Sequence, residues 1–267
     1  MHLLGEGHIS GAVPPALRHR TSALPRPSAD VVLGISRKLR PRKIRNAVRR
    51  RWFEWQLSRH RLSEAPGLLD LGSKPGGWTV PADLVDSGWC CYCVGAGGDV
   101  SFDIELMRRF GVRVRSFDPV EDYVRSARSE VGSDPRFSAF VAALATRDGP
   151  IRMQLTHHPG SRSLSADGLY ESRRYAEAPG RRLATLMDDL DDRRVDLLKV
   201  DIEGAEYRVL PELDLAAHGV RVFAVQLHHN GGVRRARELI AGVRAAGYEL
   251  VACRPAVKLT FVRSDLL

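Results

Sequence analysis

Residues 90–99 read Cys-Cys-Tyr-Cys-Val-Gly-Ala-Gly-Gly-Asp, and a helical pattern over residues 100–110 follows them before Asp118. An apolar run that ends in a glycine turn predicts a buried strand and a tight connection to a helix. Asp118 ends a second apolar segment about 20 residues further on, where a nucleoside-binding α/β unit places an acidic residue. In such a unit the glycines bring the backbone close to the ligand, and the carboxylate accepts hydrogen bonds from ribose hydroxyls.

The glycine pattern also separates one nucleoside from another. A dinucleotide fingerprint has a third glycine where this chain has Val100, and that glycine lets the first helix pack closely beneath a pyrophosphate. S-adenosylmethionine carries no phosphate there, so it is the favoured ligand. A glycine turn by itself is often no more than a tight connection, and it is Asp118 that favours a nucleoside. The residues expected to hold it are Gly95, Ala96, Gly97, Asp99, Asp118, Pro119, Ala143 and Asp201.

The rest of the chain alternates between strand and helix patterns. Strands are expected over residues 89–95, 112–117, 137–142, 195–201, 220–227, 248–252 and 258–263, and helices over residues 100–110, 121–131, 204–217 and 231–246. This alternation predicts an α/β fold with a mostly parallel, Rossmann-like sheet of seven strands and helices on both faces. Residues 254–257 are too few for a parallel crossover, so the last two strands should form an antiparallel hairpin. Asp99 is placed to cap the first helix, and Gly111 and Gly247 to end two others.

Basic residues concentrate at the N-terminus. Residues 1–66 contain 14 lysine and arginine residues against 4 acidic ones, whereas the remaining 201 residues contain 27 against 28. The net charge of +9 therefore belongs to the first segment. We expect a basic N-terminal extension over residues 1–66, irregular over residues 1–35 and then helical, followed by one α/β domain over residues 67–267.

The apolar residues of the basic segment recur at helical spacing. The stripe consists of Ile44, Val48, Trp52, Trp55 and Leu62. Because an amphipathic helix buries its apolar stripe, we expect this one to pack on the α/β domain or on a second copy of the chain, as a homodimer. The alternative is an arm that binds nucleic acid or another anionic surface. The near-neutral charge of the remaining chain makes nucleic acid the less favoured partner.

Composition restricts the compartment. No segment approaches the roughly 18 uninterrupted apolar residues that a membrane span requires, and the N-terminus lacks the apolar core of a secretory signal. We therefore expect a cytoplasmic protein without a membrane partner. Cys90, Cys91 and Cys93 lie too close together for a zinc finger, and Cys253 stands alone. All four are interpreted as small buried side chains in a reducing compartment.

Two segments interrupt the regular alternation. Residues 67–81 are rich in glycine and proline and predict a turn-rich connection. Lys74 and Trp78 of this segment could cover the opening of the ligand site. The alternative for Trp78 is that it fills the edge of the core. Residues 143–194 include a predicted strand over 151–155 and a second strand-like patch near 182–183. The polar loop between them contains His157 and His158. Such insertions commonly form substrate walls, although paired histidines in a loop are more often solvated turn residues.

The densest chemical signal is the stretch Asp-Leu-Leu-Lys-Val-Asp-Ile-Glu-Gly-Ala-Glu over residues 196–206. Carboxylates are seldom buried without a partner, so acids directly after a buried strand point to a site. Asp201 and Glu203 should emerge at the carboxyl edge of the sheet, where open α/β sheets bind ligands. The alternative makes the acids first-turn residues of a helix with Lys199 as their partner. That alternative accounts for Glu206 better than for Asp201.

This stretch resembles the signature of the FkbM-type S-adenosylmethionine-dependent methyltransferases. Residues 116–119 (Ser-Phe-Asp-Pro), residues 94–103 and residues 76–78 are similar to further segments of the family, and the resemblance covers roughly residues 67–264. It implies the class I methyltransferase fold, whose parallel sheet is finished by one antiparallel strand. It also implies methyl transfer to a hydroxyl of a small molecule, often a sugar or a polyketide-type natural product. Gln226 departs from the family pattern, which frequently has an acid there.

A sulfonium methyl is already activated, so the enzyme must mainly align the acceptor and exclude water. Asp201, Glu203, His228 and His229 are the catalytic candidates, with either histidine as general base because its pKa lies near neutrality. A rival arrangement holds Mg²⁺ on Asp201, Glu203 and His228, which is not the expected one. Two further functions stay open: a nucleic-acid methyltransferase that uses the basic arm, and a non-catalytic adenosine-binding protein.

Overall fold

The computed structural model describes residues 41–74, 76–155, 164–165 and 173–267. The expectations for residues 1–35 and for His157 and His158 lie outside this part of the chain. Among the described helices, none combines the length and the apolar character that a bilayer crossing demands.

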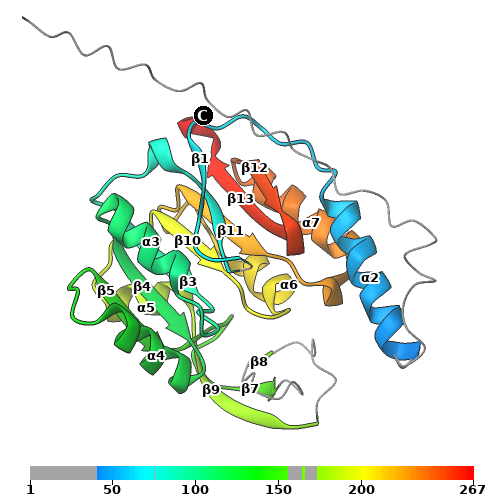
Figure 1. The fold of residues 1–267 in the computed structure, drawn as a ribbon, viewed down its shortest axis with the longest axis horizontal. Coiled ribbons are helices and arrows are strands. Elements are labelled where there is room, and N and C mark those ends of the chain that lie inside the picture. Colours follow the sequence, from blue (N-terminus) through cyan, green and yellow to red (C-terminus); the bar gives the residue numbers. More distant parts are fainter. Residues whose placement is uncertain (1–40, 75, 156–163, 166–172) are drawn as a thin grey trace, which may run out of the picture.

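The centre of the molecule is a seven-stranded sheet (Figure 1). Its strands are β3 (Cys90–Val94), β4 (Arg113–Asp118), β5 (Phe137–Val141), β10 (Leu197–Val200), β11 (Val222–Gln226), β12 (Tyr248–Arg254) and β13 (Lys258–Arg263), in the order β12-β13-β11-β10-β3-β4-β5. From β11 to β5 in this order, each strand runs parallel to its neighbour. β13 runs antiparallel to both β11 and β12. The predicted fold class and the C-terminal hairpin are confirmed.

Alternation along β3 explains why this strand is apolar throughout. Tyr92 and Val94 belong to the core on one face of the sheet, and Cys91 and Cys93 to the core on the other. A strand covered on both faces reads as a continuous apolar run. Cys253, by contrast, is only half-buried, so the expectation of four buried thiols holds for three of them.

Helices cover both faces of this sheet (Figure 1). They are α3 (Ser101–Phe110), α4 (Glu121–Val131), α5 (Leu183–Asp189), α6 (Glu206–Val209) and α7 (Gly232–Ala245). Gly111 ends α3 in the left-handed conformation, as predicted. The helix expected over residues 204–217 is wrong in length, because α6 gives way to a 3-10 turn at Leu210–Glu212. Pro211 accounts for this, since its ring cannot continue a helix interior.

The insertion between β5 and β10 forms a second sheet. Its strands are β6 (Ala143–Leu144), β7 (Gly149–Leu155), β8 (Leu164–Ser165) and β9 (Tyr175–Arg181), in the order β6-β9-β7-β8. The predicted strand over residues 151–155 is confirmed, but residues 182–183 belong to the start of α5. The strand lies earlier, where Tyr-Ala-Glu-Ala-Pro-Gly-Arg has weak strand propensity and becomes a strand by pairing with β7.

The turn-rich segment contains two short strands that the sequence did not predict, β1 (Leu68–Leu71) and β2 (Trp78–Pro81), paired antiparallel. Ahead of it, α2 (Pro41–Leu57) packs beside α7 (Figure 1). The expected contact with the α/β domain is confirmed, but through Phe53 and Leu57, which are buried. Val48 and Trp52 of the predicted stripe are 43% and 50% exposed. At about 100° per residue they project from a different side of the helix than Phe53 and Leu57.

Candidate active site

A cavity of about 410 Å³ lies at the carboxyl ends of β3, β4 and β10. Its lining includes Glu203 and all eight residues predicted to hold a nucleoside: Gly95, Ala96, Gly97, Asp99, Asp118, Pro119, Ala143 and Asp201. The second sheet contributes an apolar wall of Leu144, Ile151, Met153 and Leu164. Because parallel strands end together at one edge, segments far apart in the sequence meet here.

Two glycines of the turn after β3 have different reasons to be glycine. Gly95 has a φ of +83°, and a Cβ there would lie 1.9 Å from the backbone oxygen of Asp201. Gly97 has a φ of +60° and open space where its Cβ would be. Gly95 therefore permits a close approach of two backbone segments, whereas Gly97 leaves room inside the cavity.

Backbone donors hold the Asp118 carboxylate in place. The N–H of Gly97 donates to Oδ2 at 2.9 Å, and the N–H of Val120 donates to Oδ1 at 2.8 Å. Burial raises the pKa of Asp118, against the opposing effect of these two hydrogen bonds. Each carboxylate oxygen has a second lone pair, so this fixed group retains the capacity to accept ribose hydroxyls.

Asp99 fastens the start of α3 to the turn that precedes β2. Val100 is the N-cap residue, but Asp99 Oδ1 accepts the Ser101 N–H at 3.0 Å, close to the predicted capping role. Its Oδ2 accepts the Ser73 hydroxyl at 2.5 Å. Burial raises the pKa of Asp99 less than these hydrogen bonds lower it, so the pKa lies below its usual value.

Trp78 satisfies both interpretations of its sequence position. It is 2% exposed, packs in the core and lines the cavity. The ammonium groups of Lys199 and Lys258 lie 5.5 and 4.7 Å from its ring centroid, within the range of cation–π attraction. Lys74 is exposed and does not belong to the cavity lining.

Sequence reasoning missed Lys258, although a lysine that opens an apolar strand is a visible signal. Its Nζ donates to the carbonyls of Gly76 and Gly77 at 3.1 and 3.3 Å, and burial lowers its pKa to about 8. Lys199, which one interpretation of the sequence makes the partner of the acids, lowers the pKa of Asp201, and its Nζ donates to the carbonyls of Val94 and Gly95. Both lysines therefore hold backbone around the cavity.

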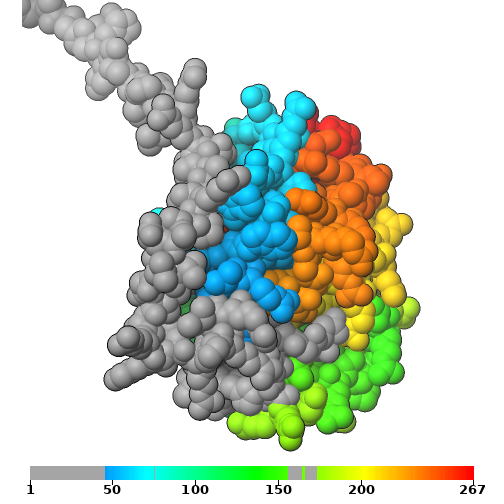
Figure 2. Space-filling model, turned by 90° about the vertical axis from the view of Figure 1, so that its right-hand side faces the viewer, coloured from blue at the N-terminus to red at the C-terminus, as the bar shows by residue number. Residues whose placement is uncertain are grey.

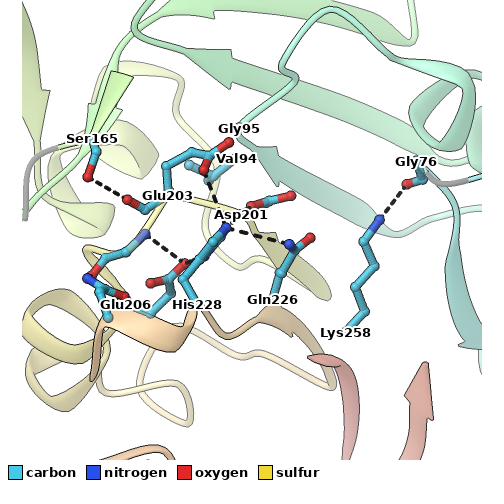
Figure 3. A network of polar contacts seen from close by, with 12 residues as sticks. Gly76, Val94, Gly95, Ser165, Asp201, Glu203, Glu206, Gln226, His228 and Lys258 are labelled. Atoms are coloured by element: carbon cyan, nitrogen blue, oxygen red, sulfur yellow. Dashed lines mark hydrogen bonds and ion pairs between the residues drawn. The ribbon is translucent and has the colours of Figure 1, made fainter. Parts of the chain in front are cut away.

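His228 lies among carboxylates (Figure 3). Its Nδ1 is 2.6 Å from Glu206 Oε1, and its Nε2 is 3.4 Å from Glu203 Oε2 and 3.9 Å from Asp201 Oδ1. Burial alone would lower the pKa of His228, but Glu206 and Glu203 raise it well above the ordinary value. Because Glu206 is fully buried, a positive imidazolium is what makes its carboxylate tolerable there.

The two histidines are placed differently. His229 begins the 3-10 turn η3 (His229–Gly231), outside the cavity lining, and burial together with Arg49 lowers its pKa. His228 stands just behind the lining, where Tyr207 donates its hydroxyl to the His228 carbonyl at 2.6 Å. The structure thus brings His228 together with Asp201 and Glu203, and leaves His229 apart.

Asp201 lines the cavity. Its Oδ1 is buried and accepts no hydrogen bond from any described residue. Burial raises the pKa of Asp201, although Lys199 and His228 act in the opposite direction. Ligand atoms of Asp201, Glu203 and His228 lie within 4.8 Å of one another, close enough for one metal ion.

Comparison with known proteins identifies the family. The FkbM methyltransferase domain matches residues 93–250, more than half of the chain. No curated protein sequence gives a significant match. Among solved structures, the fibrillarin pre-rRNA processing protein of Methanococcus jannaschii is similar at 9% identity and a TM-score of 0.39, over 67% of this chain and 68% of that one. The match over residues 93–250 shows that the chain belongs to the FkbM family of S-adenosylmethionine-dependent methyltransferases.

Proposed function

We propose that this protein transfers the methyl group of S-adenosylmethionine to a hydroxyl of a small molecule, a sugar or a natural product. The observation that carries the proposal is the shared cavity. It brings the glycine turn and Asp118 together with Asp201, whose Oδ1 is buried and without a hydrogen bond from the described residues. A nucleoside-binding site next to the carboxylate of Asp201 suits methyl transfer to a hydroxyl, because the carboxylate can accept the proton that the hydroxyl loses.

The residues around the turn fit the nucleoside half of the cofactor. The open space at Gly97 accommodates a ligand against the backbone, and the free lone pairs of Asp118 suit the two ribose hydroxyls. Ala143, the buried first residue of β6, lines the cavity, and its small apolar side chain suits the adenine ring. When bound, the cofactor supplies a sulfonium methyl that needs no further activation.

Asp201 is the general base in this proposal. Its raised pKa makes it a stronger base than an exposed aspartate, and its carboxylate lines the cavity in which an acceptor would bind. His228 is already protonated at neutral pH, because Glu206 and Glu203 raise its pKa. It therefore serves as a positioning residue that holds the acids in place, and this role replaces the expectation that His228 or His229 is the base.

Mg²⁺ is not required in this proposal. The donor set of Asp201, Glu203 and His228 has the size of a metal site, but the imidazolium already supplies a positive charge among the acids. A metal ion would have to displace the Nε2 proton of His228, and Mg²⁺ prefers oxygen ligands. We expect turnover to be unchanged after treatment with a chelator. Loss of turnover that added Mg²⁺ restores would favour the metal arrangement instead.

The experiment pairs cofactor binding with turnover. S-adenosylhomocysteine should raise the Tm of the full chain, and labelled S-adenosylmethionine should methylate members of a panel of sugars and hydroxylated natural products. Asp118→Ala serves as the control that weakens both signals. Binding without methylation of any acceptor would favour a non-catalytic nucleoside-binding protein, and absence of binding would overturn the proposal.

A further inference from the structure

Positive charge is concentrated in two segments that are adjacent in space, α2 with the residues that follow it and α7. Residues 41–61 contain eight lysine and arginine residues and one acid, and residues 232–246 contain four arginines and one acid. These two segments thus carry a surplus of ten positive charges, while the whole chain carries +9. Figure 2 shows α2 and α7 side by side on one face, where Arg237 donates to Gln56 at 2.9 Å.

Arginines dominate the outward part of this basic face. Arg49, Arg51 and Arg235 are exposed, and none of them has a salt bridge among the described residues. Within the described part of the chain, Arg50 and Arg234 pair with acids of their own helices, at 3.8 and 2.6 Å. Exposed pairs of this kind are weak, and their two acids offset only part of the arginine charge. The face therefore keeps a positive potential.

Apolar side chains interrupt these arginines. Val48 and Trp52 are separated by one helical turn and are 43% and 50% exposed. They are not needed to attach α2, because Phe53 and Leu57 do that from another side of the helix. Apolar residues flanked by arginines on the outer surface of a helix are typical of helices that lie in a membrane interface.

A small hollow of about 140 Å³ lies between α2 and α7, lined by Gln56, Arg59, His60 and Arg237. The Nε2 of His60 is buried, and no residue in the described ranges forms a hydrogen bond with it. The two arginines of this hollow suit a phosphate, because arginine matches phosphate geometry.

We propose that the α2–α7 face binds the surface of an anionic phospholipid bilayer, with Trp52 and Val48 entering the interface and the Arg59–Arg237 hollow taking a headgroup phosphate. A second copy of the chain fits less well, since it would bring two positive faces together. Nucleic acid would use the arginines, but it gives no role to Val48. The sequence expectation of no membrane partner rested on the missing spanning segment, which does not bear on surface binding.

The location links this surface to the cavity. Residues of α2 contact η3 and the 3-10 turn η4 (Pro255–Val257), and Ala256 of η4 lines the cavity. A bilayer on the basic face would therefore lie beside the rim of the candidate active site.

Vesicle sedimentation of the full chain tests the proposal. Vesicles of phosphatidylcholine with 30% phosphatidylglycerol, roughly the anionic content that attracts basic segments, should bind at least about tenfold more tightly than pure phosphatidylcholine, and salt should weaken the binding. R49E/R51E should abolish the preference, because it reverses two of the charges that attract the anionic lipid. Trp52→Ala should weaken binding to both vesicle types, because it removes the ring that enters the interface. Matched controls are R108E/R109E, with the same charge change on α3, and Tyr175→Ala, which removes another exposed aromatic ring. Both controls should bind as the wild type does.

Folding of each variant is checked by the Tm shift with S-adenosylhomocysteine, which the surface substitutions should leave unchanged. Three results would overturn the proposal. One is that the wild type binds both vesicle types equally well. Another is that R108E/R109E loses as much binding to the anionic vesicles as R49E/R51E does. The third is a different occupant of the face, shown either by single-stranded RNA that displaces the vesicles at equal phosphate concentration or by a dimer that Trp52→Ala dissociates.

Discussion

The cavity has two edges that are built in different ways. The glycine edge consists of Gly95, Gly97 and Asp118, and backbone N–H groups fix its one carboxylate. The acid edge consists of Asp201 and Glu203, with His228 and Glu206 behind the lining, and there the side chains fix one another. At the first edge, backbone N–H groups stabilise the Asp118 carboxylate. At the second edge, three carboxylates lie around the imidazole of His228.

This difference separates binding from chemistry. A carboxylate held by backbone donors is rigid and can position a ligand without changing its own protonation state. A carboxylate in a coupled cluster has a pKa that depends on its neighbours. We therefore expect substitutions at the glycine edge to change cofactor affinity, and substitutions at the acid edge to change turnover and pH dependence.

The largest expected effect is at the acid edge. Asp201→Asn removes the proposed base, and kcat should fall by about 10²- to 10⁴-fold, while the affinity for S-adenosylhomocysteine changes little. Steady-state kinetics and calorimetry measure the two quantities. Asp86→Asn is the control, because that exposed carboxylate accepts a local hydrogen bond from the Gly88 N–H and does not belong to the cavity lining. A loss of affinity as large as the loss of kcat would show that Asp201 belongs to the nucleoside seat instead.

A glycine pair tests the glycine edge. Gly95→Ala should lower the free energy of unfolding by roughly 3 kcal/mol or more, because a clash with the Asp201 backbone adds to the strain of about 1–2 kcal/mol for a left-handed residue. Gly97→Ala, with open space around it, should cost only that strain. Denaturant unfolding measures both. If the two variants are equally stable, the close approach at Gly95 is not what requires glycine.

Asp118→Ala should raise the Kd for S-adenosylhomocysteine by about 10- to 100-fold, since hydrogen bonds to a charged group contribute about 1.5–3 kcal/mol. The fold should survive, because the two released N–H groups lie at the cavity and can bind water. Isothermal titration calorimetry gives the Kd. An unchanged Kd would place the ribose elsewhere and remove the distinction between the two edges.

The smallest effect concerns pH. The raised pKa of His228 means that its contacts with Glu206 and Glu203 stabilise the fold fully below the unfolded value of about 6.5. This contribution is lost as the pH rises through the higher folded value. The wild type should therefore exceed His228→Gln in stability by about 1 kcal/mol at pH 6, or roughly 2–4 °C in Tm. The difference should shrink at alkaline pH. A difference that grows with pH would contradict a protonated His228.

Some features were accessible from sequence because they are local. Gly95 and Gly97 belong to one short turn, and the distance from there to Asp118 is fixed by a single helix and strand. The seven strands were visible because burial on both faces makes them apolar, whereas β9 was misplaced because its residues favour no strand without β7. The length of α6 was wrong because the helical pattern outweighed Pro211.

The α/β fold, the glycine turn after β3 and the acids of residues 201–206 could be predicted from the sequence, because each depends on residues close together in the chain. The folded structure adds three facts that no local pattern contains. Carboxylates surround His228 and raise its pKa, the Oδ1 of Asp201 is buried without a hydrogen bond from the described residues, and Lys258 holds the turn at Gly76. The side of α2 that faces the domain was decided there as well. The physical reason is that protonation and burial depend on neighbours in space, and Lys258 and Gly76 are 182 residues apart in the chain.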